Sequence, residues 1–143
     1  MRGSSIRIGD QADAHVRIEV EDFAHPDVAE PHGMDLLACL VYAAAPPVAA
    51  AFPLTIRVEE FSDLRDYLAQ INSGNGPPGS FALADGVFSL SFAPSRRGPI
   101  LCAVQLKSID TAHVRLEYLV TLEPESVTRT LRDLDALAEA SRR

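Results

Sequence analysis

Four side chains that can bind a metal ion lie within eight residues of one another: His25, Asp27, Glu30 and His32. Imidazole nitrogens and carboxylate oxygens are common zinc ligands. Their spacing does not reproduce a pair of histidines at i and i+4 on a helix. Pro26 and Pro31 also restrict the backbone between them. We therefore predict a solvated loop over residues 22–33, with His25 and His32 as candidate ligands but no resident metal or other cofactor.

The sequence contains no recognisable pattern for nucleophilic catalysis. Cys39 and Cys102 both lie in apolar runs without basic neighbours that would lower a thiol pKa. No Gly-x-Ser-x-Gly turn is present. The glycine-rich residues 73–80 follow a predicted helix, whereas a phosphate-binding loop precedes one. We predict two reduced core cysteines, assign no catalytic residue and favour a non-enzymatic protein, although an active site assembled from distant residues stays open.

The negative charge is concentrated in the first half of the chain. The net charge is −7, and residues 1–72 carry twelve acids against five arginines, whereas residues 73–143 carry eight acids and eight bases. Nucleic acids and anionic membranes attract clustered Lys and Arg, so neither is an expected partner. The acidic half suits a basic protein partner, although ordinary solubilising charge is the simpler explanation. The candidate partner-binding residues are Asp22, Asp27, Glu30, Glu59 and Glu60.

The length of 143 residues suits one domain, so we expect a single domain over 1–143. No apolar run reaches the roughly 18 residues that a membrane span requires, and the N-terminus lacks the apolar core of a signal peptide. The expected location is therefore the cytoplasm.

Apolar residues alternate with polar ones along most of the chain, which is typical of strands with one buried face. The pattern predicts strands over 5–9, 16–21, 52–60, 81–83, 87–92, 100–107 and 112–122. The nearly continuous apolar run 34–45 fits either a helix or a central strand buried on both faces. We favour a strand because Val41 and Tyr42 prefer extended backbone.

Two helices are expected, at about 62–72 and 124–140. Ser62 is a suitable N-cap for the first, and Pro124 suits the first position of the second. The apolar face of the second helix is predicted to contain Val127, Leu131, Leu134 and Ala138. Short connections between strands imply antiparallel pairing. We therefore predict an α+β fold, with a mainly antiparallel sheet of about seven or eight strands in the order strands, helix, strands, helix.

Both predicted helices contain the tripeptide Leu-Arg-Asp, at 64–66 and 131–133. A duplication would leave such a trace. Amphipathic helices also reuse these residues routinely, so the tripeptide alone does not distinguish the two explanations.

Four short stretches, residues 86–92, 97–101, 114–117 and 122–125, together resemble the C-terminal pattern of the WapI-like immunity proteins and related bacterial families of unknown function. That pattern is a strand, an Arg-Gly or His-Gly turn, two further strands and a helix that begins with Leu-Glu-Pro. The helix near residues 61–68 matches the family's first helix, but its tryptophan-rich segment has no counterpart here. The resemblance implies a cytoplasmic protein that neutralises a contact-delivered toxin by binding it.

The leading functional hypothesis is a non-enzymatic protein-binding module, an immunity protein that neutralises a basic bacterial toxin. The alternative is a small-ligand-binding or catalytic domain with a cleft between the sheet and the helices, near residues 22–33. A homodimer through a sheet face or an edge strand is compatible with both hypotheses.

Overall fold

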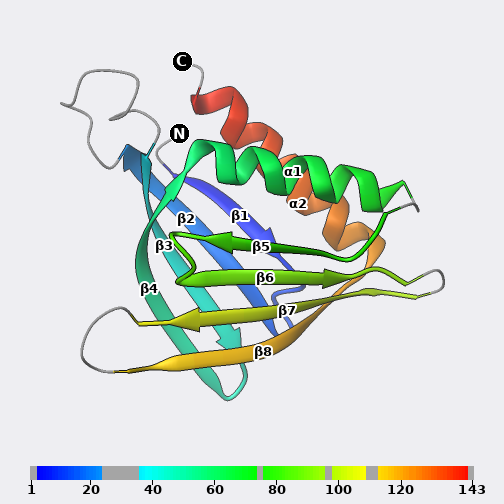
Figure 1. The fold of residues 1–143 in the computed structure, drawn as a ribbon, viewed down its shortest axis with the longest axis horizontal. Coiled ribbons are helices and arrows are strands. Elements are labelled where there is room, and N and C mark those ends of the chain that lie inside the picture. Colours follow the sequence, from blue (N-terminus) through cyan, green and yellow to red (C-terminus); the bar gives the residue numbers. More distant parts are fainter. Residues whose placement is uncertain (1–2, 24–35, 74–75, 96–97, 109–112, 142–143) are drawn as a thin grey trace.

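The computed structural model describes residues 3–23, 36–73, 76–95, 98–108 and 113–141. Within these residues the chain forms eight antiparallel strands and two helices, as Figure 1 shows. The predicted α+β class and element order are confirmed. The strands divide into two four-stranded sheets, with orders β1-β2-β3-β4 and β5-β6-β7-β8. In Figure 1 the strands of the second sheet run across those of the first.

The first sheet consists of β1 (Ser4–Ile8), β2 (His15–Phe23), β3 (Leu36–Ala45) and β4 (Val48–Arg57). Its inner face is a ladder of apolar side chains: Ile6 pairs with Ile18, which pairs with Val41, and all three are fully buried. The strand predicted over 34–45 is confirmed as β3. Its burial alternates from residue to residue, so its second face is partly exposed and not buried as expected.

The second sheet consists of β5 (Gly79–Leu83), β6 (Phe88–Ala93), β7 (Ile100–Lys107) and β8 (Arg115–Leu122). The predicted hairpin turn at Asp85 and Gly86 lies between β5 and β6. Both residues have positive φ, 57° and 87°, as does Ala84 before them. A glycine and an aspartate are among the residues that adopt this conformation most readily. The last strand is shorter than predicted, because it starts at Arg115 and not at residue 112.

The first helix, α1 (Val58–Asn72), begins four residues earlier than the sequence predicts. Residues 58–60 continue the alternation of β4, which is why they were predicted as strand. The Glu60 carboxylate accepts a hydrogen bond from the backbone N–H of Arg57, 2.6 Å away, and so caps the helix there. Glu59 and Glu60 in the first turn also favour the positive end of the helix dipole.

The second helix, α2 (Pro124–Ser141), begins at the predicted proline. Its buried face is rotated from the predicted one, since Thr130 and Leu137 are buried in place of Leu131 and Ala138. Thr130 tolerates this position because its hydroxyl donates to the Arg7 carbonyl at 2.5 Å and lies 2.9 Å from the Ser126 carbonyl.

The two halves of the chain have the same order of elements, four strands followed by a helix. Cys39 pairs with Val20 and Leu54 in the first sheet, and Cys102 pairs with Phe92 and Val120 in the second. The helices repeat as well, because Phe61, Leu64, Leu68 and Ile71 have the same spacing as Val127, Thr130, Leu134 and Leu137. In this alignment the two Leu-Arg-Asp tripeptides are one residue out of register. The register of the strands therefore supports a duplication, but the tripeptide does not.

Each helix binds the first strands of the opposite half. From α2, Asp133 and Thr130 bind Arg7 of β1. From α1, Tyr67 stacks on Phe81 of β5, with ring centroids 5.2 Å apart. Figure 1 shows α1 above β5 and α2 above β1. A single hydrophobic cluster consequently includes residues of both sheets and both helices.

Candidate functional site

Three of the five predicted partner-binding residues lie in the described part of the chain, and they lie at one end of the fold. Asp22 is exposed near the end of β2, where it pairs with Ala38 of β3. Ala38 in turn pairs with Thr55, just before the exposed Glu59 and the half-buried Glu60 at the start of α1. Asp27 and Glu30 fall outside the described residues. The fold thus brings together acids that are far apart in the sequence.

Two further acids join this end, which we call the acidic end (Glu21, Asp22, Glu59, Glu60 and Asp85). The β2–β3 register skips Glu21, so this residue forms a bulge. Asp85 follows Ala84, whose backbone N–H donates to Glu60 Oε1 at 3.2 Å. Sequence reasoning missed Asp85 because this contact joins the two halves of the chain. Glu60 itself is structural, since its carboxylate accepts from both Arg57 and Ala84.

The exposed side of α1 extends the acidic end along the helix. Glu59, Asp63 and Asp66 are all exposed, and their spacing of four and three places them on one helical face. The spacing was available in the sequence as a signal. Arg65 beside them forms two ion pairs: its Nε lies 2.6 Å from Asp135 Oδ1 of α2, and its Nη1 lies 3.4 Å from Asp66 Oδ1. The surface therefore stays strongly negative.

The candidate metal ligands His25 and His32 lie outside the described residues. Among the residues that the structure describes, no group of three or more His, Cys, Asp or Glu side chains has metal-binding geometry.

Both cysteines are free and buried, as predicted. Burial raises the pKa of the Cys39 thiol to about 12, with a further increase from the negative charges of Glu21 and Glu60. Burial alone raises the pKa of Cys102 to about 12. Since the thiolate is the nucleophilic form, neither thiol is chemically active in the folded protein at neutral pH.

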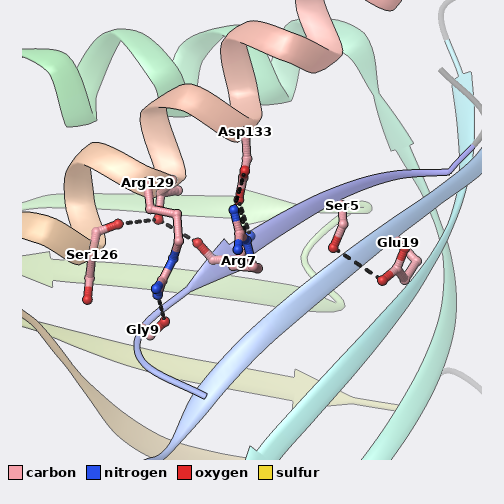
Figure 2. Close-up of polar contacts among 8 residues, drawn as sticks. Ser5, Arg7, Gly9, Glu19, Ser126, Arg129 and Asp133 are labelled. Carbon is pink, nitrogen blue, oxygen red and sulfur yellow. Dashed lines mark hydrogen bonds and ion pairs between the residues drawn. The ribbon is translucent and has the colours of Figure 1, made fainter. Parts of the chain in front are cut away.

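Two arginines cross the junction between α2 and the start of the chain in opposite directions (Figure 2). Arg7 reaches from β1 to Asp133, where its Nε and Nη2 donate to the two carboxylate oxygens, both at 3.0 Å. This hydrogen bonding raises the pKa of Arg7 above its ordinary value. Arg129 reaches from α2 to the β1–β2 turn, where its Nη2 donates to the Gly9 carbonyl.

The outer face of the second sheet carries an open groove of about 440 Å³. Leu119 borders it and is 61% exposed. Two of its polar lining residues bind each other, since Gln105 Nε2 donates to Glu117 Oε1 at 2.9 Å. A third, Ser91, has its hydroxyl 3.0 Å from that of Ser80 beside the groove. The groove thus offers contact area on the outer face of this sheet. A second cavity, of about 230 Å³, lies between α1 and α2 and is lined mainly by apolar side chains.

Comparisons with protein-family models, with curated proteins and with solved structures find no significant match to the chain. In the described ranges, neither helix is long and apolar enough to cross a membrane.

Proposed function

We propose that this chain is a protein-binding module that recognises a basic protein through its acidic end and the exposed face of α1. The observation that carries the proposal is that Asp22, Glu59 and Asp85, which come from three separate segments, gather at one end of the molecule. Acids assembled in this way attract a basic partner over a distance and speed its association.

The same surface supports binding more than catalysis. Its carboxylates are exposed or take part in helix capping, and the nearby thiol of Cys39 is buried and protonated. A general acid or base requires a titratable group in a sheltered site. Protein recognition requires only complementary charge over a wide area.

We further propose that the basic partner is a bacterial toxin, in line with the resemblance of residues 86–125 to the WapI-like immunity proteins. Such a protein acts by covering the toxin, so it needs affinity and no chemistry of its own. Small-ligand binding remains the second candidate function, and the observation that favours it is an arginine-lined pocket at the opposite end of the first sheet.

The test compares three forms of the protein in affinity capture from the native cytoplasm at low salt. The acidic-end variant is Glu21→Gln, Asp22→Asn, Glu59→Gln and Asp85→Asn, and Glu60 is kept because it caps α1. A matched control removes four exposed acids elsewhere: Asp13→Asn, Glu117→Gln, Glu123→Gln and Glu125→Gln. Both variants change the net charge equally.

We expect the wild type to capture a basic protein whose binding weakens as salt rises. The acidic-end variant should bind it at least about tenfold more weakly, and the control within about twofold. Equal loss in both variants, or the absence of a salt-sensitive partner, contradicts recognition by the acidic end. If the captured partner does not harm cells that lack this protein, the immunity role is wrong although binding stands.

A further inference from the structure

A small pocket of about 190 Å³ lies where α2 meets the β1–β2 turn. We call it the arginine pocket; its lining residues are Arg7, Arg17, Arg129 and His15, together with Gly9, Asp10 and Gln11 of the turn. Three guanidinium groups against a single carboxylate make this lining positive, on a chain whose net charge is −7.

Two of the three arginines have carboxylate partners outside the pocket lining. Arg7 and Arg17 face each other across β1 and β2, a placement in which like charges repel. Asp133 compensates Arg7 with a two-point ion pair, and Glu19 binds the guanidinium of Arg17. Arg17 also lies over the ring of Tyr42, 4.2 Å from its centroid. These contacts fix the walls of the pocket.

Arg129 is different, because no carboxylate among the described residues pairs with it. Its Nη2 donates to a neutral carbonyl, that of Gly9, and its Nε is buried without a hydrogen-bond partner. A partly buried cation normally has a counter-charge, because losing its hydration is costly. Asp10, the one carboxylate of the lining, accepts a hydrogen bond from the backbone N–H of Ala12 and forms no ion pair with Arg129. Among the described residues, Arg129 therefore has no carboxylate in direct contact.

His15 lies on the opposite wall. Its Nδ1 is 2.8 Å from the carbonyl oxygen of Asp13, which can only accept, so Nδ1 carries the hydrogen. Nε2 is left for another partner. The pocket therefore offers this ring nitrogen together with the guanidinium of Arg129, of which Nη2 binds the Gly9 carbonyl and Nε is buried.

We propose that the arginine pocket binds a phosphate group, with Arg129 supplying the principal positive charge. A guanidinium matches phosphate oxygens in both geometry and charge, and it stays charged at every physiological pH. His15 Nε2, which lines the same pocket, offers a further hydrogen-bonding position for the phosphate group. The proposal is independent of the protein-binding role, because the pocket lies at the other end of β2 from the acidic end.

The experiment titrates the full chain with inorganic phosphate, with ribose 5-phosphate and with sodium chloride at matched ionic strength. Two-dimensional NMR follows the backbone amides of Gly9 and Gln11 and the guanidinium N–H of Arg129. Arg129→Gln is the test variant, and Arg132→Gln, an exposed arginine on the same helix, is the matched control. His15→Gln probes the opposite wall if Arg129→Gln does not fold.

Saturable shifts at these positions with phosphate, and none with chloride, are the expected result. Arg129→Gln should weaken binding at least about tenfold and Arg132→Gln within twofold, since charge-assisted hydrogen bonds contribute most of such affinity. His15→Gln should weaken it several-fold. Tighter binding of ribose 5-phosphate identifies a phosphate ester as the ligand, and equal binding identifies free phosphate. Equal effects of chloride and phosphate, or unchanged binding by Arg129→Gln, overturn the proposal.

Discussion

Cys39 and Cys102 lie at corresponding places in the third strand of each sheet, and burial favours the protonated form of both thiols. Their pKa values of about 12 lie above the ordinary thiol value of 9.0. In the unfolded chain both thiols ionise near pH 9, so the unfolded state binds fewer protons than the folded state above that pH. The stability that burial of the neutral thiols contributes is therefore complete below pH 9 and is lost as the pH rises towards 12.

We expect the free energy of unfolding to fall more steeply in the wild type than in the double variant Cys39→Ala, Cys102→Ala between pH 9 and 11. The difference in slope is up to about 1.4 kcal/mol per pH unit for each thiol. Urea unfolding at a series of pH values, under reducing conditions, measures it. Tyr118, whose pKa burial also raises, is present in both proteins and cancels. Parallel curves for the two proteins would rule out ionisation of these thiols as the cause.

Single residues were predictable only where their environment is local. The burial of both cysteines followed from the apolar runs around them. Glu60 was predicted as a partner-binding residue, and no sequence pattern could show that its carboxylate accepts a hydrogen bond from Ala84 of the other half. Arg129 drew no attention for the same reason, because its carbonyl partner, Gly9, lies far away in the sequence.

At the scale of elements, the β1–β2 turn is fixed by its contact with β8. Gly9 has φ +92°, and a Cβ atom there would lie 2.5 Å from Cγ1 of the buried Val120. Tyr118 of β8 strengthens the contact, since its hydroxyl donates to the His15 carbonyl at 2.8 Å. The turn of one half thus rests on the last strand of the other.

Gly9→Ala should therefore be much more destabilising than Gly86→Ala. Gly86 has a similar φ of +87° but nothing within 4 Å of its would-be Cβ, so alanine there incurs only the backbone penalty of about 1–2 kcal/mol. At Gly9 the clash with Val120 adds about 1–3 kcal/mol. Thermal and urea unfolding of both variants test this. Equal losses would mean that β8 does not restrict the turn.

Most elements could be predicted from the alternation of apolar and polar residues. The errors lie at boundaries where neighbouring residues do not differ enough in polarity to mark where one element ends and the next begins. The start of β4 was missed because residues 49–51 are alanines, which mark neither face. The start of α1 was placed too late because Val58 continues the alternation of β4. Neither error reflects a weak element, since β4 pairs with β3 along its whole length and the Glu60 carboxylate caps the start of α1.

For the molecule as a whole, periodicity shows that a face is buried but not what covers it. The sequence predicted one mainly antiparallel sheet of about seven or eight strands. The strands instead form two four-stranded sheets, and this division depends on contacts between the two halves of the chain. The placement of each helix on the opposite half is likewise outside the reach of sequence patterns. It makes the two halves mutually dependent.

We predict that the whole chain unfolds in one cooperative transition and that residues 1–75 and 76–143, made separately, do not fold as monomers. Separating the halves would remove the ion pair between Arg7 and Asp133 and the ring contact between Tyr67 and Phe81. Circular dichroism and urea unfolding of the chain and of both pieces provide the measurement, and an equimolar mixture should regain the native spectrum. A cooperative monomeric half would contradict the prediction and the single domain that it tests.

The packing of each helix on the opposite half of the chain also bears on how such a protein could have arisen. A polypeptide of half this length, with four strands and one helix, would find the first strand that its helix must cover only on a second copy of itself. Such a half would therefore complete the architecture only by pairing with a second copy, and a duplication would join that pair in one chain.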